Sequence, residues 1–141
     1  MLKDFIKKLH EQASKQKALV LQSFFKTGAV EYGAGDEFIG VTVPQIRAVV
    51  KQAYANLSLP ELAQILASKI HEERLFALLC LVAKFEDTQD LKQQKIMVDF
   101  YLKAATQKQI NNWDLVDLSC YKILGSYLFA SDKAATILYK F

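Results

Sequence analysis

The sequence predicts an all-α protein, arranged as an α-solenoid of about seven antiparallel helices. Three observations favour this fold. Apolar residues recur at the spacing of an α-helix along most of the chain. Glycine and proline are scarce, with five and two in 141 residues, which argues against a turn-rich β-sandwich. Helix pairs recur about every 40 residues, but their internal similarity is weak, so a plain helical bundle is the alternative fold.

The N-terminal part of the chain is predicted to hold two helices and then a bend. An amphipathic pattern runs from residue 2 to 9 and resumes from 18 to 25. Residues 28–43 interrupt this pattern and contain four of the five glycines, so we expect the backbone to bend there. These glycines are Gly28, Gly33, Gly35 and Gly40.

Two capping boxes predict where the next helices begin. Thr42 and Gln45 have the spacing of a capping box, with Pro44 in the first turn, and predict a helix that continues to about residue 53. Ser58 and Glu61 repeat the same spacing. A short helix over about 60–67 is therefore expected.

The most apolar helix is predicted at 71–85, where the sequence has its longest apolar run. Asp87 is expected to cap the following helix, over 88–105. We then expect a helix over 113–124, capped by Asn111 or Asn112 and ended by Gly125.

A last helix is predicted from Ser131 to Phe141, where its apolar pattern is still running. No cap follows, and the end repeat of a solenoid needs a polar outer face. We therefore expect a partner, a dimer contact or a further segment to cover this end.

Composition and charge exclude several classes of protein. The net charge of +3, from 18 basic and 15 acidic residues, indicates only a mild preference for polyanions. Neither a signal peptide nor an apolar run that could span a membrane is recognisable. Two cysteines favour a reducing, cytoplasmic location over a disulfide framework. We expect Cys80 and Cys120 to be small core residues, and His10 and His71 to lie at surface or capping positions.

Motifs for metals and nucleotide cofactors are incomplete. His71 begins a pattern typical of zinc-protease helices, but Leu75 stands where the second histidine would be. Gly33 and Gly35 begin a dinucleotide fingerprint, but Phe38 occupies the position of its third glycine and no strand precedes it. We therefore expect neither a metal nor a cofactor.

The only tryptophan lies in a polar segment that suggests a site. On a helix, Trp113 and Asp117 are four residues apart and share one face, while Asp114 lies one position round, beside the positive N-terminal end. An aromatic ring and a carboxylate would then face the same cleft. The alternative is a structural role, with a core tryptophan and helix-capping aspartates.

Several motifs carry a family resemblance along essentially the whole chain. They are Phe-Phe-Lys-Thr-Gly at 24–28, Tyr-Gly at 32–33, Phe-Ile-Gly-Val at 38–41, Ile-His-Glu-Glu-Arg-Leu-Phe-Ala at 70–77 and, most specific, Trp-Asp-Leu-Val-Asp at 113–117. Together they resemble the DNA alkylation repair family of HEAT-like-repeat DNA glycosylases. The resemblance implies a curved HEAT-like α-solenoid that binds double-stranded DNA on its concave face and excises cationic N3- or N7-alkylated purines.

The resemblance also implies roles for individual residues. It places the catalytic carboxylate at Asp117 and a lesion-lining ring at Trp113. A cationic alkylpurine leaves as a neutral base, so one carboxylate that stabilises the oxocarbenium-like sugar and orients water suffices. Tyr32, Thr42 and Arg47 are implied to contact the DNA backbone, Thr42 at a helix N-terminus and Arg47 as a charged clamp.

Family members continue beyond the helix that corresponds to 131–141, with a second tryptophan and an arginine that grips DNA. Here Trp113 is the only tryptophan, and Arg47 and Arg74 are the only arginines. We therefore expect residues 1–141 to form a single HEAT-like helical domain, the N-terminal part of a longer solenoid. Glycosylase activity is implied for the longer parent protein, and the activity of this chain, its oligomeric state and the adducts handled stay open. The alternative is a non-catalytic HEAT-like scaffold that binds DNA or protein.

Overall fold

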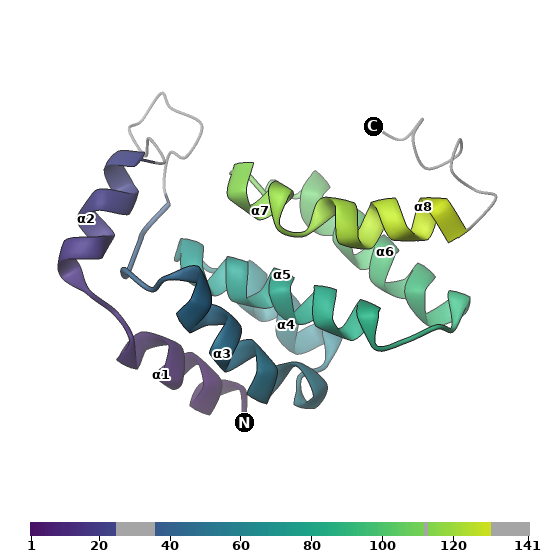
Figure 1. Ribbon diagram of the computed structural model, residues 1–141, viewed down its shortest axis with the longest axis horizontal. Helices are drawn as coiled ribbons and strands as arrows, with labels where there is room; N and C mark the ends of the chain where they lie inside the picture. The colour runs from purple at the N-terminus through teal and green to yellow at the C-terminus, as the bar shows by residue number, and fades with distance from the viewer. Residues whose placement is uncertain (25–35, 112, 131–141) are drawn as a thin grey trace.

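The computed structural model describes residues 1–24, 36–111 and 113–130, which are mostly helical (Figure 1). In chain order the elements are α1 (Leu2–Glu11), α2 (Lys15–Phe24), α3 (Val43–Ala53), the 3-10 helix η1 (Tyr54–Asn56), α4 (Leu59–Leu66), α5 (His71–Glu86), α6 (Leu91–Thr106), α7 (Trp113–Asp117), the π-helix η2 (Tyr121–Gly125) and α8 (Ser126–Ala130). No strand forms in these ranges, and Glu37 and Ile70 make an isolated parallel bridge. The all-α prediction is confirmed, and the solenoid arrangement stays a prediction.

Some predicted features fall outside the described residues. They are Gly28, Gly33, Gly35, the possible cap Asn112 and the helix over 131–141. In the part of the chain that is described, no helix combines the length and the apolar character needed to cross a bilayer.

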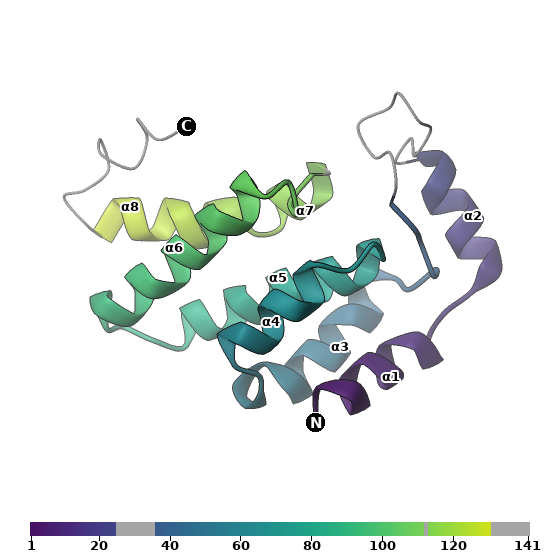
Figure 2. The ribbon, with the colours of Figure 1, turned by 180° about the vertical axis from the view of Figure 1, so that it is seen from behind.

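Helix α5 forms the centre of the core. Every residue from 75 to 82 is buried, which explains why this stretch is apolar on all faces. Helices α1 and α3 lie on one side of α5, whereas α7, η2 and α8 lie on the other (Figure 1). The reverse view places α4 and α6 over the back of α5 (Figure 2).

Cys80 of α5 is fully buried in the core, as predicted, and burial raises the pKa of its thiol to about 12. Cys120 is half-buried.

Both predicted capping boxes form. Thr42 Oγ1 accepts from the Gln45 amide at 3.4 Å, and the Thr42 amide donates to Gln45 Oε1 at 2.9 Å. Ser58 and Glu61 exchange the equivalent bonds at 3.3 and 3.0 Å. These bonds satisfy amides that the first helical turn leaves without partners, so α3 and α4 begin where the sequence indicates.

The predicted cap at Asp87 is wrong. Helix α6 begins at Leu91, and Asp90 caps it by accepting from the Lys92 amide at 3.0 Å. Asp87 ends α5 with helical dihedral angles, whereas an N-cap needs an extended backbone. Its carboxylate instead accepts from the Tyr54 hydroxyl at 2.6 Å.

The single helix predicted over 113–124 is also wrong, because the chain forms α7, then η2, then α8. Gly125 is the last residue of η2, but it does not end the helical run as predicted. Among the described glycines only Gly40 has a positive φ, so Gly125 lacks the left-handed conformation of a C-terminal cap. Ser126 follows it with helical dihedral angles, and the chain continues directly into α8.

Candidate functional site

A groove of about 770 Å³ lies among α2, the segment 36–42, α3, α5 and α7. Its lining is mostly apolar, and α2 contributes Val20 and Leu21 to one wall. The polar side chains of the lining are Gln16, Lys17, Thr42, His71, Glu72, Asp114 and Asp117. An apolar groove with a few convergent polar groups is the usual form of a ligand site.

The prediction that His71 lies at a surface or capping position is wrong. The residue is only 2% exposed, and its ring stacks on Phe38 with 4.7 Å between the ring centroids. Nε2 lies 2.6 Å from Asp114 Oδ2, and Nδ1 lies 3.3 Å from Asp36 Oδ2. A ring in contact with two carboxylates is satisfied only when both nitrogens carry protons. His10 does lie nearer the surface, where it pairs with Glu73 at 3.0 Å.

Arg74 completes a buried cluster with these groups. Its Nη2 donates to Asp36 Oδ2 at 2.6 Å and to Asn111 Oδ1 at 3.0 Å. The Asn111 amide nitrogen also donates to Asp36 Oδ1 at 3.5 Å. Two carboxylates therefore face two cationic side chains, and this pairing offsets part of the desolvation cost of burying the four groups. The cluster joins α5, the segment before α3 and the first turn of α7.

The pKa shifts in this cluster favour the charged forms. Burial by itself would lower the pKa of His71, but the hydrogen bonds to Asp114 and Asp36 outweigh burial, so its pKa is raised above 6.5. Burial would raise the pKa of Asp36, but the bonds from His71 and Arg74 hold that pKa below 3.8. A raised pKa for the histidine and a lowered pKa for the carboxyl group are both expected where a histidinium lies between carboxylates.

Glu72 holds the segment that leads into α3. The residue is 2% exposed, and its carboxylate accepts from three consecutive backbone amides. Oε2 lies 3.2 Å from the Ile39 amide, 2.8 Å from the Gly40 amide and 3.2 Å from the Val41 amide. Gly40 has φ +81°, which lets these amides converge on one carboxylate. The same segment ends at Thr42, on the groove.

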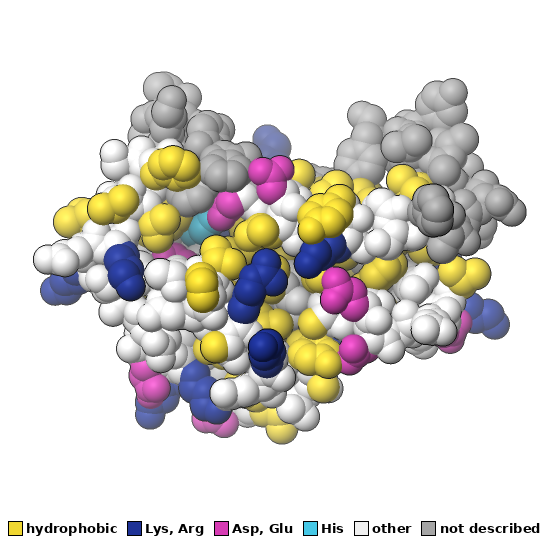
Figure 3. Space-filling model, in the orientation of Figure 1, with side chains coloured by type: hydrophobic (Ala, Val, Ile, Leu, Met, Phe, Trp, Pro, Cys, Tyr) yellow, Lys and Arg dark blue, Asp and Glu magenta, His cyan; other side chains and the backbone are white. Residues whose placement is uncertain are grey.

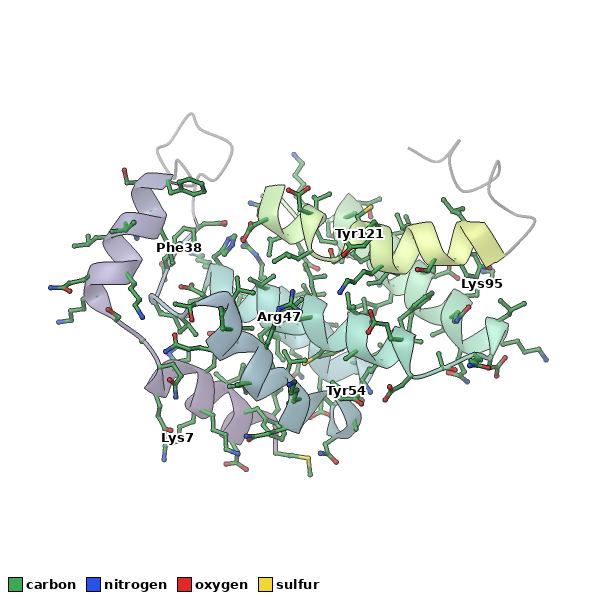
Figure 4. The ribbon with its side chains drawn as sticks, in the orientation of Figure 1. Lys7, Phe38, Arg47, Tyr54, Lys95 and Tyr121 are labelled. Carbon is green, nitrogen blue, oxygen red and sulfur yellow. The ribbon has the colours of Figure 1, made fainter. Side chains whose placement is uncertain are left out.

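The structure brings only part of the predicted site together. Asp117 and Thr42 both line the groove, and Asp117 is exposed. Trp113 begins α7, but its side chain lies outside the described residues, as does the whole of Tyr32. Arg47 is exposed on α3, apart from the groove lining, on the face where Tyr121 also lies (Figure 4).

Basic side chains gather in the middle of that face, over α3 and α5 (Figure 3). The basic residues of α3 are Arg47 and Lys51, and that of the C-terminal turn of α5 is Lys84. Lys122 of η2 approaches Glu86 across this face at 3.9 Å. Figure 3 also shows acidic side chains beside these basic ones, so the face carries charges of both signs.

Sequence reasoning missed four buried charged residues, namely Asp36, His71, Glu72 and Arg74. One signal could have found three of them. Helix α5 is apolar all round, so its first turn is buried as well, and polar residues in a buried turn need partners. Asp36 gives no such signal, because it follows a glycine-rich stretch with no periodicity of its own.

The described residues thus combine an all-helical core, an apolar groove with an exposed carboxylate on its lining, and basic side chains on a nearby face. Comparison with known families defines the protein further: the family model for "DNA alkylation repair enzyme" matches residues 5–141. The chain therefore belongs to the DNA alkylation repair enzyme family, which assigns it to DNA repair and to interaction with DNA. No curated protein and no solved structure matches the chain.

Proposed function

We propose that the protein is a DNA glycosylase that hydrolyses the N-glycosidic bond of cationic N3- or N7-alkylated purines in double-stranded DNA. Asp117 is the catalytic carboxylate in this proposal, and Trp113, which begins the same helix, presents its ring to the lesion. The observation that carries the proposal is the exposure of Asp117 on an apolar groove. A substrate in such a groove displaces water, so a carboxylate there interacts strongly with positive charge.

The surroundings of Asp117 support its role over that of Asp114. Both residues line the groove, but Asp114 is committed to His71 at 2.6 Å. The ion pairs among the described residues do not include Asp117. Its charge is therefore available to a cationic substrate. The carboxylate would stabilise positive charge on the sugar and orient the attacking water, while the neutral base leaves without a general acid.

Replacing Asp117 by asparagine should reduce base release at least about a hundredfold, because it removes the charge that stabilises the transition state. The measurement is single-turnover release of 7-methylguanine and 3-methyladenine from methylated DNA by the 141-residue chain. Asp99→Asn is a matched control. Asp99 is exposed on α6 and pairs with Lys95 at 2.8 Å, far from the groove lining, so this variant should keep the wild-type rate.

Two results would contradict the proposal. The first is no release by the wild-type chain, and the second is equal release by wild type and Asp117→Asn. DNA binding that survives in both proteins without base release would identify the chain as a non-catalytic scaffold.

Replacing Arg47 by alanine should weaken DNA binding about equally for methylated and unmethylated duplexes. An exposed arginine on the basic face contacts phosphates and not the lesion. The slope of log Kd against log salt should fall by about one unit, as expected for the loss of one phosphate contact. Fluorescence anisotropy titrations at several salt concentrations measure this, with Lys92→Ala on α6 as the control. An unchanged salt slope would exclude Arg47 from the DNA interface.

A further inference from the structure

We propose that His71 is a positioning residue, a buried histidinium that clamps the first turn of α7 to α5 and thereby fixes Asp117 in the groove. This inference rests on the proposed function, because Asp117 is the residue that His71 would position. His71 itself is 2% exposed and acts through Asp114, three residues before Asp117 on the same helix.

Few of the described contacts fix α7. The helix has only five residues, too few to be stable without tertiary contacts. Leu115 is fully buried, and Leu118 packs partly against the core. Within the described ranges, the Asp114–His71 pair at 2.6 Å is the ion pair that ties this helix to another element. The rotation of α7, and with it the direction of Asp117, is therefore set by the packing of Leu115 together with that pair.

His71 is itself held in place by its neighbours. Its ring is stacked on Phe38 on one side, and its Nδ1 is directed at Asp36. Asp36 is held in turn by Arg74 at 2.6 Å. Among the described residues, the charged groups that face the ring are Asp36 from the segment before α3, Asp114 from α7 and Arg74 from its own helix. Glu72 lies beside it on α5 but is engaged with backbone amides, and Lys17 of α2 and Asp117 share the same groove.

The two contacts of His71 with carboxylates depend on the protonation of its ring. A neutral imidazole carries one N–H, so one of its two contacts with carboxylates loses its donor when the ring deprotonates. The pKa of His71 is raised by Asp114 and Asp36 against the effect of burial. The stabilisation of the folded state by the charged His71 ring is therefore complete below pH 6.5. It is lost as the pH rises through the higher pKa that His71 has in the folded protein.

The test uses three variants. His71→Gln removes the charge but keeps an N–H donor, and Asp114→Asn removes the charge on the α7 side while leaving the pairs among Asp36, His71 and Arg74. His10→Gln is the matched control, because His10 is the other histidine of the chain and its side chain is 39% exposed.

We expect His71→Gln and Asp114→Asn to lower the single-turnover rate of base release about tenfold or more, since small displacements of a catalytic group have such effects. The Kd for methylated DNA should change less than about threefold, because DNA is bound mainly through phosphates.

A second readout needs no DNA. Trp113 is the only tryptophan and begins α7, so its fluorescence emission reports the surroundings of that helix. Emission should shift in His71→Gln and Asp114→Asn at pH 6 but not in His10→Gln. As pH rises through the titration of His71, the wild-type emission and rate should move toward those of His71→Gln, whose own values should stay flat.

The inference is overturned if His71→Gln keeps the wild-type rate and pH profile, or if emission is unchanged in both His71→Gln and Asp114→Asn. Should the wild-type chain release no base, the proposed glycosylase function fails separately. The emission measurements then still decide whether His71 clamps α7.

Discussion

Replacing Glu72 by alanine is expected to lower the free energy of unfolding by about 4 kcal/mol, because three backbone amides lose their common acceptor inside the protein. Its carboxylate accepts from Ile39, Gly40 and Val41, and the side chain is 2% exposed. Water cannot replace it without opening the segment, and the truncation also leaves a cavity. Urea unfolding followed by circular dichroism measures the change.

Glu86→Ala is the matched control on the same helix. The Glu86 side chain is 57% exposed and lies 3.9 Å from Lys122, so its loss should cost less than about 1 kcal/mol. A loss of similar size in both variants would show that Glu72 does not hold the 39–41 amides in solution. Glu72→Gln should give an intermediate loss, since the amide oxygen still accepts but without charge.

Replacing Gly40 by alanine should cost about 3 kcal/mol. Gly40 has φ +81°, and a Cβ atom there would overlap the backbone oxygen of Ser14 and lie 2.8 Å from the amide nitrogen of Ala18. Neither backbone group can yield easily, because Ser14 donates its own amide to Ile39 and accepts from Ala18, both at 2.9 Å. The free-energy costs of the strained backbone and of the steric overlap therefore add together.

Gly125→Ala is the control for this substitution. At Gly125 a Cβ atom would meet only the Tyr121 Cβ, at 3.9 Å, and the backbone is helical on both sides. Alanine there should leave stability unchanged or raise it by about 0.5 kcal/mol, because alanine loses less conformational entropy in a helix. Thermal unfolding of both variants measures the contrast, and equal melting temperatures would contradict it.

The sequence predicts the helical fold well because its signals there are local. The capping boxes at Thr42 and Ser58 and the apolar run of α5 depend on residues within one or two turns of each other. The two wrong boundaries have a common cause. Asp87 and Gly125 have the residue types of a cap, but the backbone conformation that a cap needs is set by tertiary packing.

The candidate site could be predicted only where its residues lie on one helix. Asp114 and Asp117 are three apart, and the groove lining contains both. The partners of Asp114 could not be found in this way, because His71 is 43 positions away along the chain and Asp36 a further 35. Helical periodicity carries no information about which distant charges meet, so the buried cluster emerges only from the three-dimensional arrangement.

That cluster has a consequence for how the chain folds. Its hydrogen bonds join residues 35, 37, 38, 43 and 75 positions apart, whereas most bonds in a helical protein span four. Closing such loops costs entropy that is recovered only when α5 and its neighbours are already in place. We therefore expect the cluster to form in the late steps of folding and its stabilising energy to act chiefly by slowing unfolding.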